Sequence, residues 1–276
     1  MRKIILSFIC AVSIFSTSTS LAYVGAVSTA TGGSGRGAME PVDGVLLNPA
    51  IISDLPKKNL SVHYSDKDWA LTVADNGKEA YFPAALVFRR TDMDPLTTQQ
   101  LGLAFATPRY YGMTFGGTIS MYDYTHKITP AQEEQYKVGV LDLGMTLAVT
   151  SNFGLGFVAK KVGSGQADLP EAMQVQKTIS LGMSYTYQNF ARLRFDVESA
   201  PDNKTDKLVY MMGLENFLND WLVFRLGFQN NNVLEKDYFT AGVGFAGPQF
   251  GVHYAYISNI KDRTENKHLI DLSIPF

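Results

Sequence analysis

The segment LDLGMTLAV, residues 141–149, alternates apolar and polar side chains along its whole length. Successive side chains of a β-strand point to opposite faces, so this segment forms a strand with one apolar and one polar face. Residues 178–187 (TISLGMSYTY) and 191–198 (ARLRFDVE) repeat the alternation. No helical period of about 3.6 competes with this pattern after residue 59, so the sequence predicts strands from there on.

Fourteen segments of this kind follow one another along the chain. Runs of alternating residues separated by Gly, Pro, Asn and Asp are typical of antiparallel strands joined by turns. The predicted strands are 59–65, 68–75, 82–90, 97–106, 111–122, 136–149, 153–162, 174–187, 190–198, 207–216, 220–229, 237–245, 249–257 and 267–276.

The connections decide between a closed barrel and a β-sandwich. From the fourth strand on, short turns alternate with long polar connections, as in transmembrane barrels, whereas a sandwich needs only about half as many strands. The sequence therefore predicts an all-β fold, a single transmembrane antiparallel β-barrel of about 14 strands. The short turns are near 107–110, 150–152, 188–189, 217–219 and 246–248, and the long connections are near 123–135, 163–173, 199–206, 230–236 and 258–266.

Aromatic residues collect near both predicted ends of the strands. A membrane barrel carries two aromatic girdles, one at each membrane–water interface. The predicted girdle at the short-turn end contains Tyr110, Tyr111, Phe153, Tyr187, Phe190, Trp221, Phe250 and Phe276. The predicted girdle at the long-loop end contains Tyr122, Tyr124, Tyr136, Tyr238 and Tyr256.

Composition excludes several classes of protein. The chain has 276 residues, 18% of them charged, a net charge of −2 and a mean hydropathy of −0.03. No basic patch suggests a nucleic-acid partner, so none is expected. A mean hydropathy near zero fits alternating strands, in which apolar and polar residues average out. No later stretch approaches the roughly 18 uninterrupted apolar residues of a transmembrane helix.

Residues 1–22 have the features of a cleaved secretory signal peptide. Arg2 and Lys3 precede an apolar run, and residues 20–22 (SLA) end in the small residue expected at a cleavage site. The single cysteine, Cys10, lies within the apolar run and leaves with it. Export without disulfide bonds is therefore predicted.

The C-terminal segment LIDLSIPF, residues 269–276, alternates and ends in an aromatic residue. It resembles the C-terminal signature of outer-membrane barrels, which implies that Phe276 is an assembly signal read by the barrel-assembly machinery. Together with the signal peptide, it predicts a Gram-negative-type outer membrane, with outer-membrane lipid around the barrel.

The segment 23–58 lacks alternation, and so it does not belong to the predicted wall at 59–276. It contains a Gly-rich stretch, residues 35–38 (GRGA), then Glu40 and Asp43, and then residues 48–50 (NPA). In this order, these motifs resemble the FadL-type outer-membrane transporters of hydrophobic compounds and the related PorV/PorQ barrels.

The resemblance implies that residues 23–58 form a plug inside a fourteen-stranded barrel. It implies a channel for small hydrophobic compounds or, as in the PorV-like relatives, a scaffold or secretion accessory that transports nothing. The chain is far shorter than the fatty-acid transporters and its outer loops are brief, so the identity of the ligand does not carry over. The residues implied in plugging and gating are Gly35, Arg36, Gly37, Glu40, Asn48, Pro49 and Ala50.

Two plug residues have specific expectations. Arg36 pairs with Glu40 or with a wall carboxylate, unless it is simply a solvated loop charge. Asn48 caps a short helix with Pro49 at its first position, where a missing N–H is tolerated.

Assigning the apolar face of each strand to lipid leaves a set of charged residues for the lumen. A Lys or Arg on the lipid face near the midplane costs roughly 2–4 kcal/mol, which supports this assignment. Antiparallel pairing brings Arg192 near Glu215, and the arginines form either an anion site or an internal ion-pair network that docks the plug. The predicted lumen residues are Asp142, Arg192, Arg194, Glu215, Arg225, His253 and Asp271, with Arg89, Asp196, Glu198 and Lys207 beside them.

The sequence does not favour an enzyme. His253 is expected beside Asp271, but no serine partner is evident, so a hydrolase at the barrel rim is the least favoured alternative. No metal-ligand spacing and no phosphate-binding loop occur, and no cofactor is expected. Pro83, near the start of the third predicted strand, is the candidate for a lateral opening in the wall, because proline cannot donate to a strand ladder.

Overall fold

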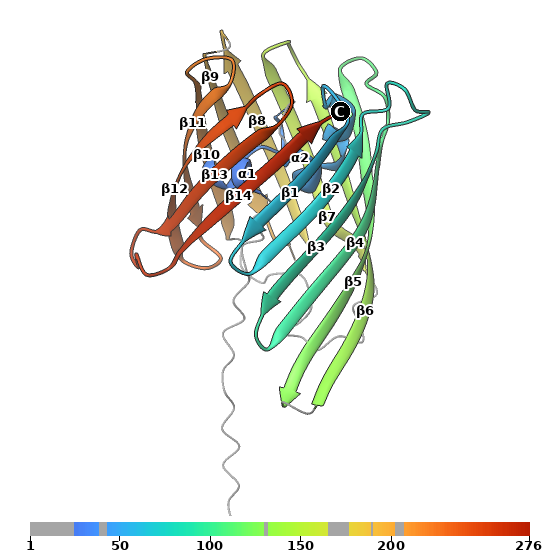
Figure 1. Cartoon of the computed structure of the whole chain (residues 1–276), viewed down its shortest axis with the longest axis vertical. Helices are drawn as coiled ribbons and strands as arrows, with labels where there is room; N and C mark the ends of the chain where they lie inside the picture. Colours follow the sequence, from blue (N-terminus) through green and yellow to red (C-terminus); the bar gives the residue numbers. More distant parts are fainter. Residues whose placement is uncertain (1–24, 39–42, 130–131, 165–176, 189, 202–206) are drawn as a thin grey trace, which may run out of the picture.

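The computed structural model describes residues 25–38, 43–129, 132–164, 177–188, 190–201 and 207–276. In this part of the chain, fourteen antiparallel strands form a closed barrel, as predicted (Figure 1). The strands are β1 (Asn59–Ser65), β2 (Asp68–Asp75), β3 (Ala84–Met93), β4 (Leu96–Ala106), β5 (Met113–Thr129), β6 (Gln132–Ala148), β7 (Phe153–Ser164), β8 (Thr178–Tyr187), β9 (Ala191–Ser199), β10 (Leu208–Phe217), β11 (Leu222–Asn231), β12 (Lys236–Ala246), β13 (Gly251–Asn259) and β14 (Asn266–Pro275).

The first and last strands close the sheet. Strand β1 pairs with β14 along its whole length, from Asn59 opposite Pro275 to Ser65 opposite Leu269. Closure leaves no free sheet edge, so the strands satisfy their backbone hydrogen bonds internally, which is a condition for spanning lipid.

Side chains alternate between an apolar outer surface and a buried interior. In β4, Leu101, Leu103 and Phe105 are exposed, whereas Ala104 and Ala106 are buried. The same alternation places exposed Leu, Ile, Val, Phe and Met side chains on the outside of the other strands. A large exposed apolar surface promotes aggregation in water, whereas a barrel that faces lipid requires such a surface.

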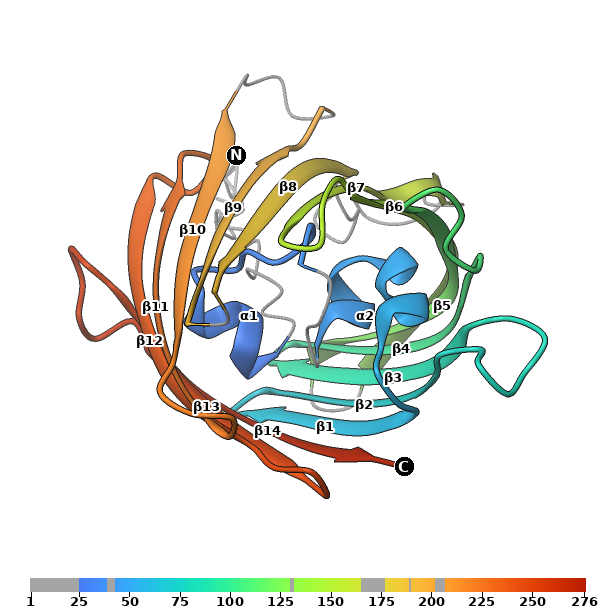
Figure 2. The ribbon, with the colours of Figure 1, turned by 90° about the horizontal axis from the view of Figure 1, so that it is seen from above.

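Three short helices lie inside the barrel (Figure 2). They are α1 (Ala26–Ala30), α2 (Gly44–Leu47) and the 3-10 helix η1 (Pro49–Asp54). We refer to the described residues 25–38 and 43–58 as the plug. Among the described residues, no helix is both long enough and apolar enough to cross a membrane.

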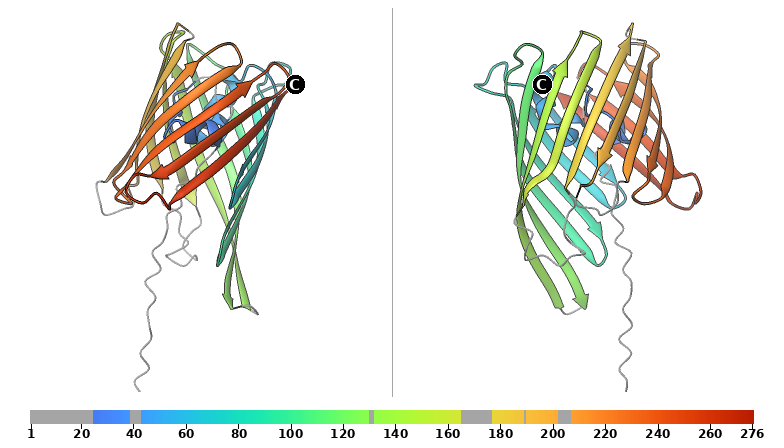
Figure 3. Two further views of the ribbon diagram at one scale, coloured as in Figure 1. Left: turned by 60° about the vertical axis from the view of Figure 1, so that its left-hand side comes forward. Right: turned by 180° about the vertical axis from the view of Figure 1, so that it is seen from behind.

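One predicted loop is wrong. Residues 123–135 were expected to form a long connection, but β5 and β6 extend through most of this range and pair up to Thr129 and Gln132. The resulting hairpin projects beyond the rest of the barrel (Figure 3). Its polar composition resembles that of a loop because the hairpin extends past the apolar part of the wall.

The short–long alternation, predicted only from the fourth strand on, does not extend to the first strands. At the end that carries the long connections, β1 and β2 are joined by residues 66–67 and β3 and β4 by residues 94–95. At the opposite end, which we call the turn end, β2 and β3 are joined by the longer segment 76–83. The turn end of an outer-membrane barrel faces the periplasm.

The aromatic girdle is confirmed at one end only. At the turn end, Phe153 is only half-buried, and the other predicted rings are exposed: Tyr110, Tyr111, Tyr187, Phe190, Trp221, Phe250 and Phe276. At the other end the prediction is wrong for most members. Their position in the alternation places them on the inner faces of their strands, and only Tyr256 points outward. The inward-facing members are Tyr122, Tyr124, Tyr136 and Tyr238.

The last residue gives a first testable prediction. Phe276 is exposed and continues the outward face of Ile270, Leu272 and Ile274 on β14. Deleting Phe276 is expected to slow barrel assembly several-fold while export across the inner membrane continues. The measurement is the rate at which pulse-labelled protein acquires heat-modifiable migration on gels, with Phe276→Tyr as the control that retains an aromatic end. Assembly at the normal rate without Phe276 would contradict its role as a signal.

Candidate functional site: the plug and the barrel interior

Arg36 anchors the plug to β9. Its guanidinium lies 3.1 Å from the carboxylate of Asp196 and 2.6 Å from that of Glu198. Burial opposes the charge of Arg36, but Glu198 and Asp196 together hold its pKa above the usual value. Arg36 therefore pairs with carboxylates of the wall and is not a solvated loop charge. Glu40, the other expected partner, lies outside the described residues.

The glycines beside Arg36 allow the plug backbone to reach the wall. The backbone N–H groups of Gly35 and Arg36 both donate to Asp196, at 2.9 and 3.0 Å. Gly35 has a φ of +140°, which favours glycine. A Cβ on Gly37 would lie 2.7 Å from the carbonyl oxygen of Gly182 on β8, so no side chain fits there. The three residues thus form one docking turn against β8 and β9.

Asn48 serves both the plug and the wall. Its Oδ1 accepts from the N–H of Ala50 at 3.1 Å, so it caps η1, and Pro49 stands at the first position of that helix. Its Nδ2 donates to the carbonyl of Arg36 at 2.9 Å and to that of Met145 on β6 at 3.1 Å. One fully buried amide therefore ties together η1, the Arg36 turn and the wall.

A belt of inward-facing glycines on the wall was not anticipated from the sequence. Each lies where a Cβ would come within about 3 Å of a plug atom or of an anchor of the plug, so the plug packs on bare backbone. On each of these strands, a glycine occupies an inward-facing position of the apolar–polar alternation. This pattern in the sequence could have revealed the belt. Its members are Gly116, Gly144, Gly156, Gly182, Gly213, Gly227 and Gly242.

The first helix of the plug is held at its N-terminus by carboxylates. The N–H of Ala26 donates to Asp271 at 2.6 Å, and the N–H of Ser28 donates to Asp43 at 2.7 Å. His253 lies directly opposite Asp271 in the β13–β14 register, as expected. The imidazole that contacts Asp271, however, is that of His63 on β1, at 2.9 Å.

His253 instead belongs to a cluster of arginines around one carboxylate, which we call the Glu215 cluster. Glu215 is fully buried and contacts Arg194, Arg225 at 2.9 Å and Arg192 at 3.5 Å. Arg225 in turn lies 3.2 Å from the Nδ1 atom of His253. The predicted proximity of Arg192 and Glu215 is confirmed, since the two residues face each other in the β9–β10 register.

Asp142 lies away from this cluster, at an irregularity in the wall. The β6–β7 register shifts at this position, and Asp142 accepts from the backbone N–H of Lys161 at 2.7 Å. Lys160, next in sequence, donates to the carbonyl of Leu46 in the plug at 3.1 Å. Lys160 is in phase with the inward-facing Val158, so the regular alternation of β7 places this cationic side chain on the plug.

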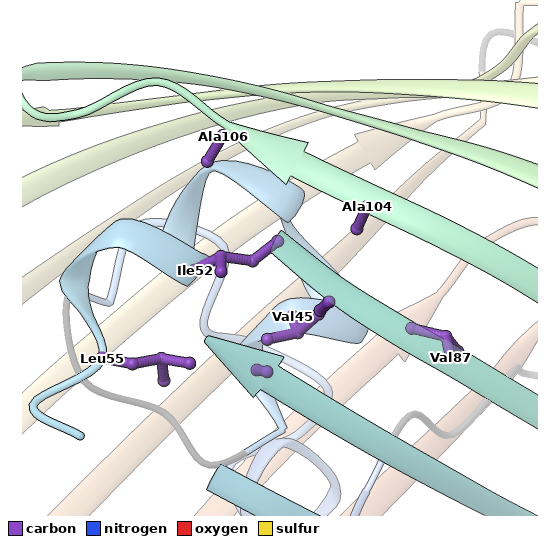
Figure 4. Close-up of a cluster of buried hydrophobic side chains, with 8 residues drawn as sticks. Val45, Ile52, Leu55, Val87, Ala104 and Ala106 are labelled. Atoms are coloured by element: carbon purple, nitrogen blue, oxygen red, sulfur yellow. The ribbon is translucent and has the colours of Figure 1, made fainter. Parts of the chain in front are cut away.

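Apolar contacts also join the plug to the wall: Ala26 and Ala30 of α1 pack against β12–β14, and a larger cluster lies on β2–β4. Val45, Ile52 and Leu55 of the plug pack against small apolar residues on the inner face of β2, β3 and β4 (Figure 4). We call this the apolar sector. Its wall residues are Ala74, Ala85, Val87, Ala104 and Ala106.

Pro83 lies at the edge of this sector, immediately before β3. Its carbonyl accepts from the N–H of Ala106 at 3.0 Å. The β2–β3 ladder runs without a register shift from Asp68 to Asp75, and the β3–β4 ladder is also regular. Pro83 therefore occupies a strand start, where a proline removes no ladder bond.

The polar contacts of the described interior join the plug to the wall. Among the described residues, no group of three or more His, Cys, Asp and Glu side chains is placed to hold a metal ion. Within the same residues, the two lumen imidazoles have ionic neighbours and no serine hydroxyl hydrogen-bonded to them. Ion pairs and inward-facing glycines hold the plug around Arg36, and the apolar sector packs it against β2–β4.

Solved structures with the same architecture include two toluene transporters and a FadL homologue. The toluene transporter TbuX of Ralstonia pickettii matches over 91% of this chain and 98% of its own, with 14% identity and a TM-score of 0.67. The toluene transporter TodX of Pseudomonas putida matches over 91% and 96%, with 14% identity and a TM-score of 0.65. A FadL homologue of Pseudomonas aeruginosa matches over 91% and 97%, with 10% identity and a TM-score of 0.61.

Sequence comparison adds no closer relative. No family model matches the chain, and no curated protein matches it either. The predicted resemblance is therefore confirmed by structure and at the level of the fold. With its fourteen strands and its N-terminal plug in the lumen, the chain has the fold of the FadL-type outer-membrane transporters.

Proposed function

We propose that this chain is an outer-membrane channel that passes small hydrophobic molecules, and that it is exported with a cleaved signal peptide. The fold and the apolar outer surface support the membrane location. The toluene transporters TbuX and TodX, which share the fold, support the class of ligand.

The apolar sector carries the proposal. Charges and hydrogen bonds hold the plug on the other strands, including β14, where Ala26 packs beside its hydrogen bond to Asp271. A neutral apolar molecule gains nothing by replacing such polar contacts. Between the plug and β2–β4, by contrast, both surfaces are apolar and the wall side chains are as small as alanine. A hydrophobic molecule that passes the plug does so most favourably along this sector, where it displaces apolar contacts alone.

A pair of adjacent residues in β4 tests this path. Ala104 faces the plug and is fully buried, whereas its neighbour Leu103 is exposed on the lipid side. Ala104→Phe is expected to reduce toluene uptake several-fold, toward the level of cells that lack the protein, because the ring fills the sector. Leu103→Phe, the matched control, leaves uptake unchanged.

The readout is accumulation of labelled toluene in cells with an intact lipopolysaccharide outer membrane. Both variants must first show heat-modifiable migration, since overpacking a buried site costs typically about 1–3 kcal/mol. Equal uptake by Ala104→Phe, Leu103→Phe and the unmodified chain would place the path elsewhere in the barrel.

The Glu215 cluster favours a second candidate, a barrel that serves as a scaffold or secretion accessory. A lumen filled by a plug on buried ion pairs is suited to staying closed, and the two-residue connections at 66–67 and 94–95 are too short to capture a ligand themselves. Toluene uptake by the unmodified chain no higher than in cells without it would select this candidate.

A further inference from the structure

The segment 76–83 leaves the barrel wall at the turn end. It is the longest of the connections at that end between described strands. In Figures 1 and 2 it projects sideways from the rim, outward from the barrel and away from the lumen.

The loop has a closed neck. Gly77 has a φ of +76°, and a Cβ on it would lie 2.6 Å from the backbone nitrogen of Pro83, so the two ends of the loop touch. Asp75 accepts from the N–H of Gly77 at 2.9 Å, and Asn76 accepts from that of Lys78 at 3.1 Å. Turns of this kind fix the direction in which the tip points.

Polar contacts tether the neck to the end of the plug. The buried amide of Asn76 donates to the carbonyl of Leu55 at 3.0 Å, and Lys78 donates to that of Pro56 at 3.1 Å. Lys58 lies 3.0 Å from Glu79 on the loop. The loop is therefore held in place from the barrel side while its tip projects.

The tip carries two aromatic rings on the lipid side of the wall. Tyr81 is fully exposed, and Phe82 is half exposed. The ring of Phe82 lies 5.7 Å from that of Phe105, edge to face, and Phe105 is on the outward face of β4 with Leu101 and Leu103. The loop therefore continues the lipid-facing surface of the wall beyond its rim.

We propose that residues 76–83 form a membrane-interface anchor that inserts Tyr81 and Phe82 among the phospholipid headgroups of the periplasmic leaflet. A tyrosine ring has an apolar body and a polar tip, and such side chains concentrate where lipid meets water. Phe82, packed on Phe105, occupies the deeper position, and Tyr81 the shallower one. The proposal concerns lipid contact and holds whether or not the barrel transports anything.

Tryptophan fluorescence tests the anchor in the full chain. The native Trp69 and Trp221 are first replaced with Phe, and then Tyr81→Trp or Phe82→Trp provides a single reporter. Each protein is reconstituted in phosphatidylethanolamine–phosphatidylcholine vesicles that carry a nitroxide either on the headgroup or deep on the acyl chain. Ile119→Trp, on the exposed face of β5, is the reference for lipid, and Lys137→Trp, on the projecting hairpin, is the reference for water.

The headgroup nitroxide is expected to quench Tyr81→Trp at least twofold more than it quenches Lys137→Trp. The acyl nitroxide is expected to quench Phe82→Trp more than Tyr81→Trp and less than Ile119→Trp. Heat-modifiable migration is the folding control for every variant. If one of the two loop variants does not fold, the other still tests the proposal by itself. Quenching of both loop reporters no greater than that of Lys137→Trp would overturn the proposal.

Discussion

Glu215→Ala is expected to destabilise the barrel by about 3–5 kcal/mol, because breaking a buried ion pair leaves uncompensated charge in the interior. Glu215 is the carboxylate shared by Arg192, Arg194 and Arg225, and its side chain is 2% exposed. Removing it takes away the carboxylate that these three neighbouring guanidiniums share, and their mutual repulsion remains. The measurement is the midpoint of urea unfolding in detergent micelles, followed by loss of heat-modifiable migration.

Glu235→Ala is the matched control for this change. Glu235 also pairs with a cation, Lys207 at 2.6 Å, but the glutamate side chain is 77% exposed. Water and salt screen such a pair, so its loss is expected to leave the unfolding midpoint nearly unchanged. Equal midpoints for the Glu215 and Glu235 variants would mean that the interior is wet enough to solvate the arginines.

The wall could be predicted from the sequence because its determinants are local. Alternation within a strand fixes which side chains face lipid, and the cost of charge in lipid then assigns the charged set to the lumen. The proximity of Arg192 and Glu215 also followed, since those strands are joined by one connection. The same reasoning misjudged residues 123–135, where a hairpin outside the membrane has a polar composition that resembles a loop.

The contacts of the plug could not be predicted in the same way. Arg36 and Asp196 are 160 residues apart, and no turn links their elements. Asp271 was expected beside His253, yet its contact is with His63, which barrel closure brings to β14 from the other end of the chain. The inward-facing glycines were visible in the sequence, but their meaning depends on knowing that a backbone packs against them.

Deleting residues 23–45 is expected to open the lumen. The deletion removes α1 and the Arg36 turn, and with them the hydrogen bonds to Asp196 and Asp271, while every wall strand remains. The plug contributes no strand to the ladder, so the barrel is expected to fold. Single-channel conductance in planar bilayers is expected to rise from near zero to a stable open level.

Arg36→Ala is expected to act in the same direction but more weakly. It leaves Asp196 and Glu198 facing each other without their cation, yet Asn48 and the backbone bonds to Asp196 still hold the turn. Brief openings are therefore expected in place of a stable open level. Arg36→Lys is the control, since it retains the charge but cannot reach two carboxylates with one planar fork. The frequency of openings in Arg36→Lys is expected to lie between that of Arg36→Ala and that of the unmodified chain.

Near-zero conductance in all of these proteins, including the deletion, would mean that the wall's own side chains close the lumen. The scaffold candidate would then be favoured over the channel.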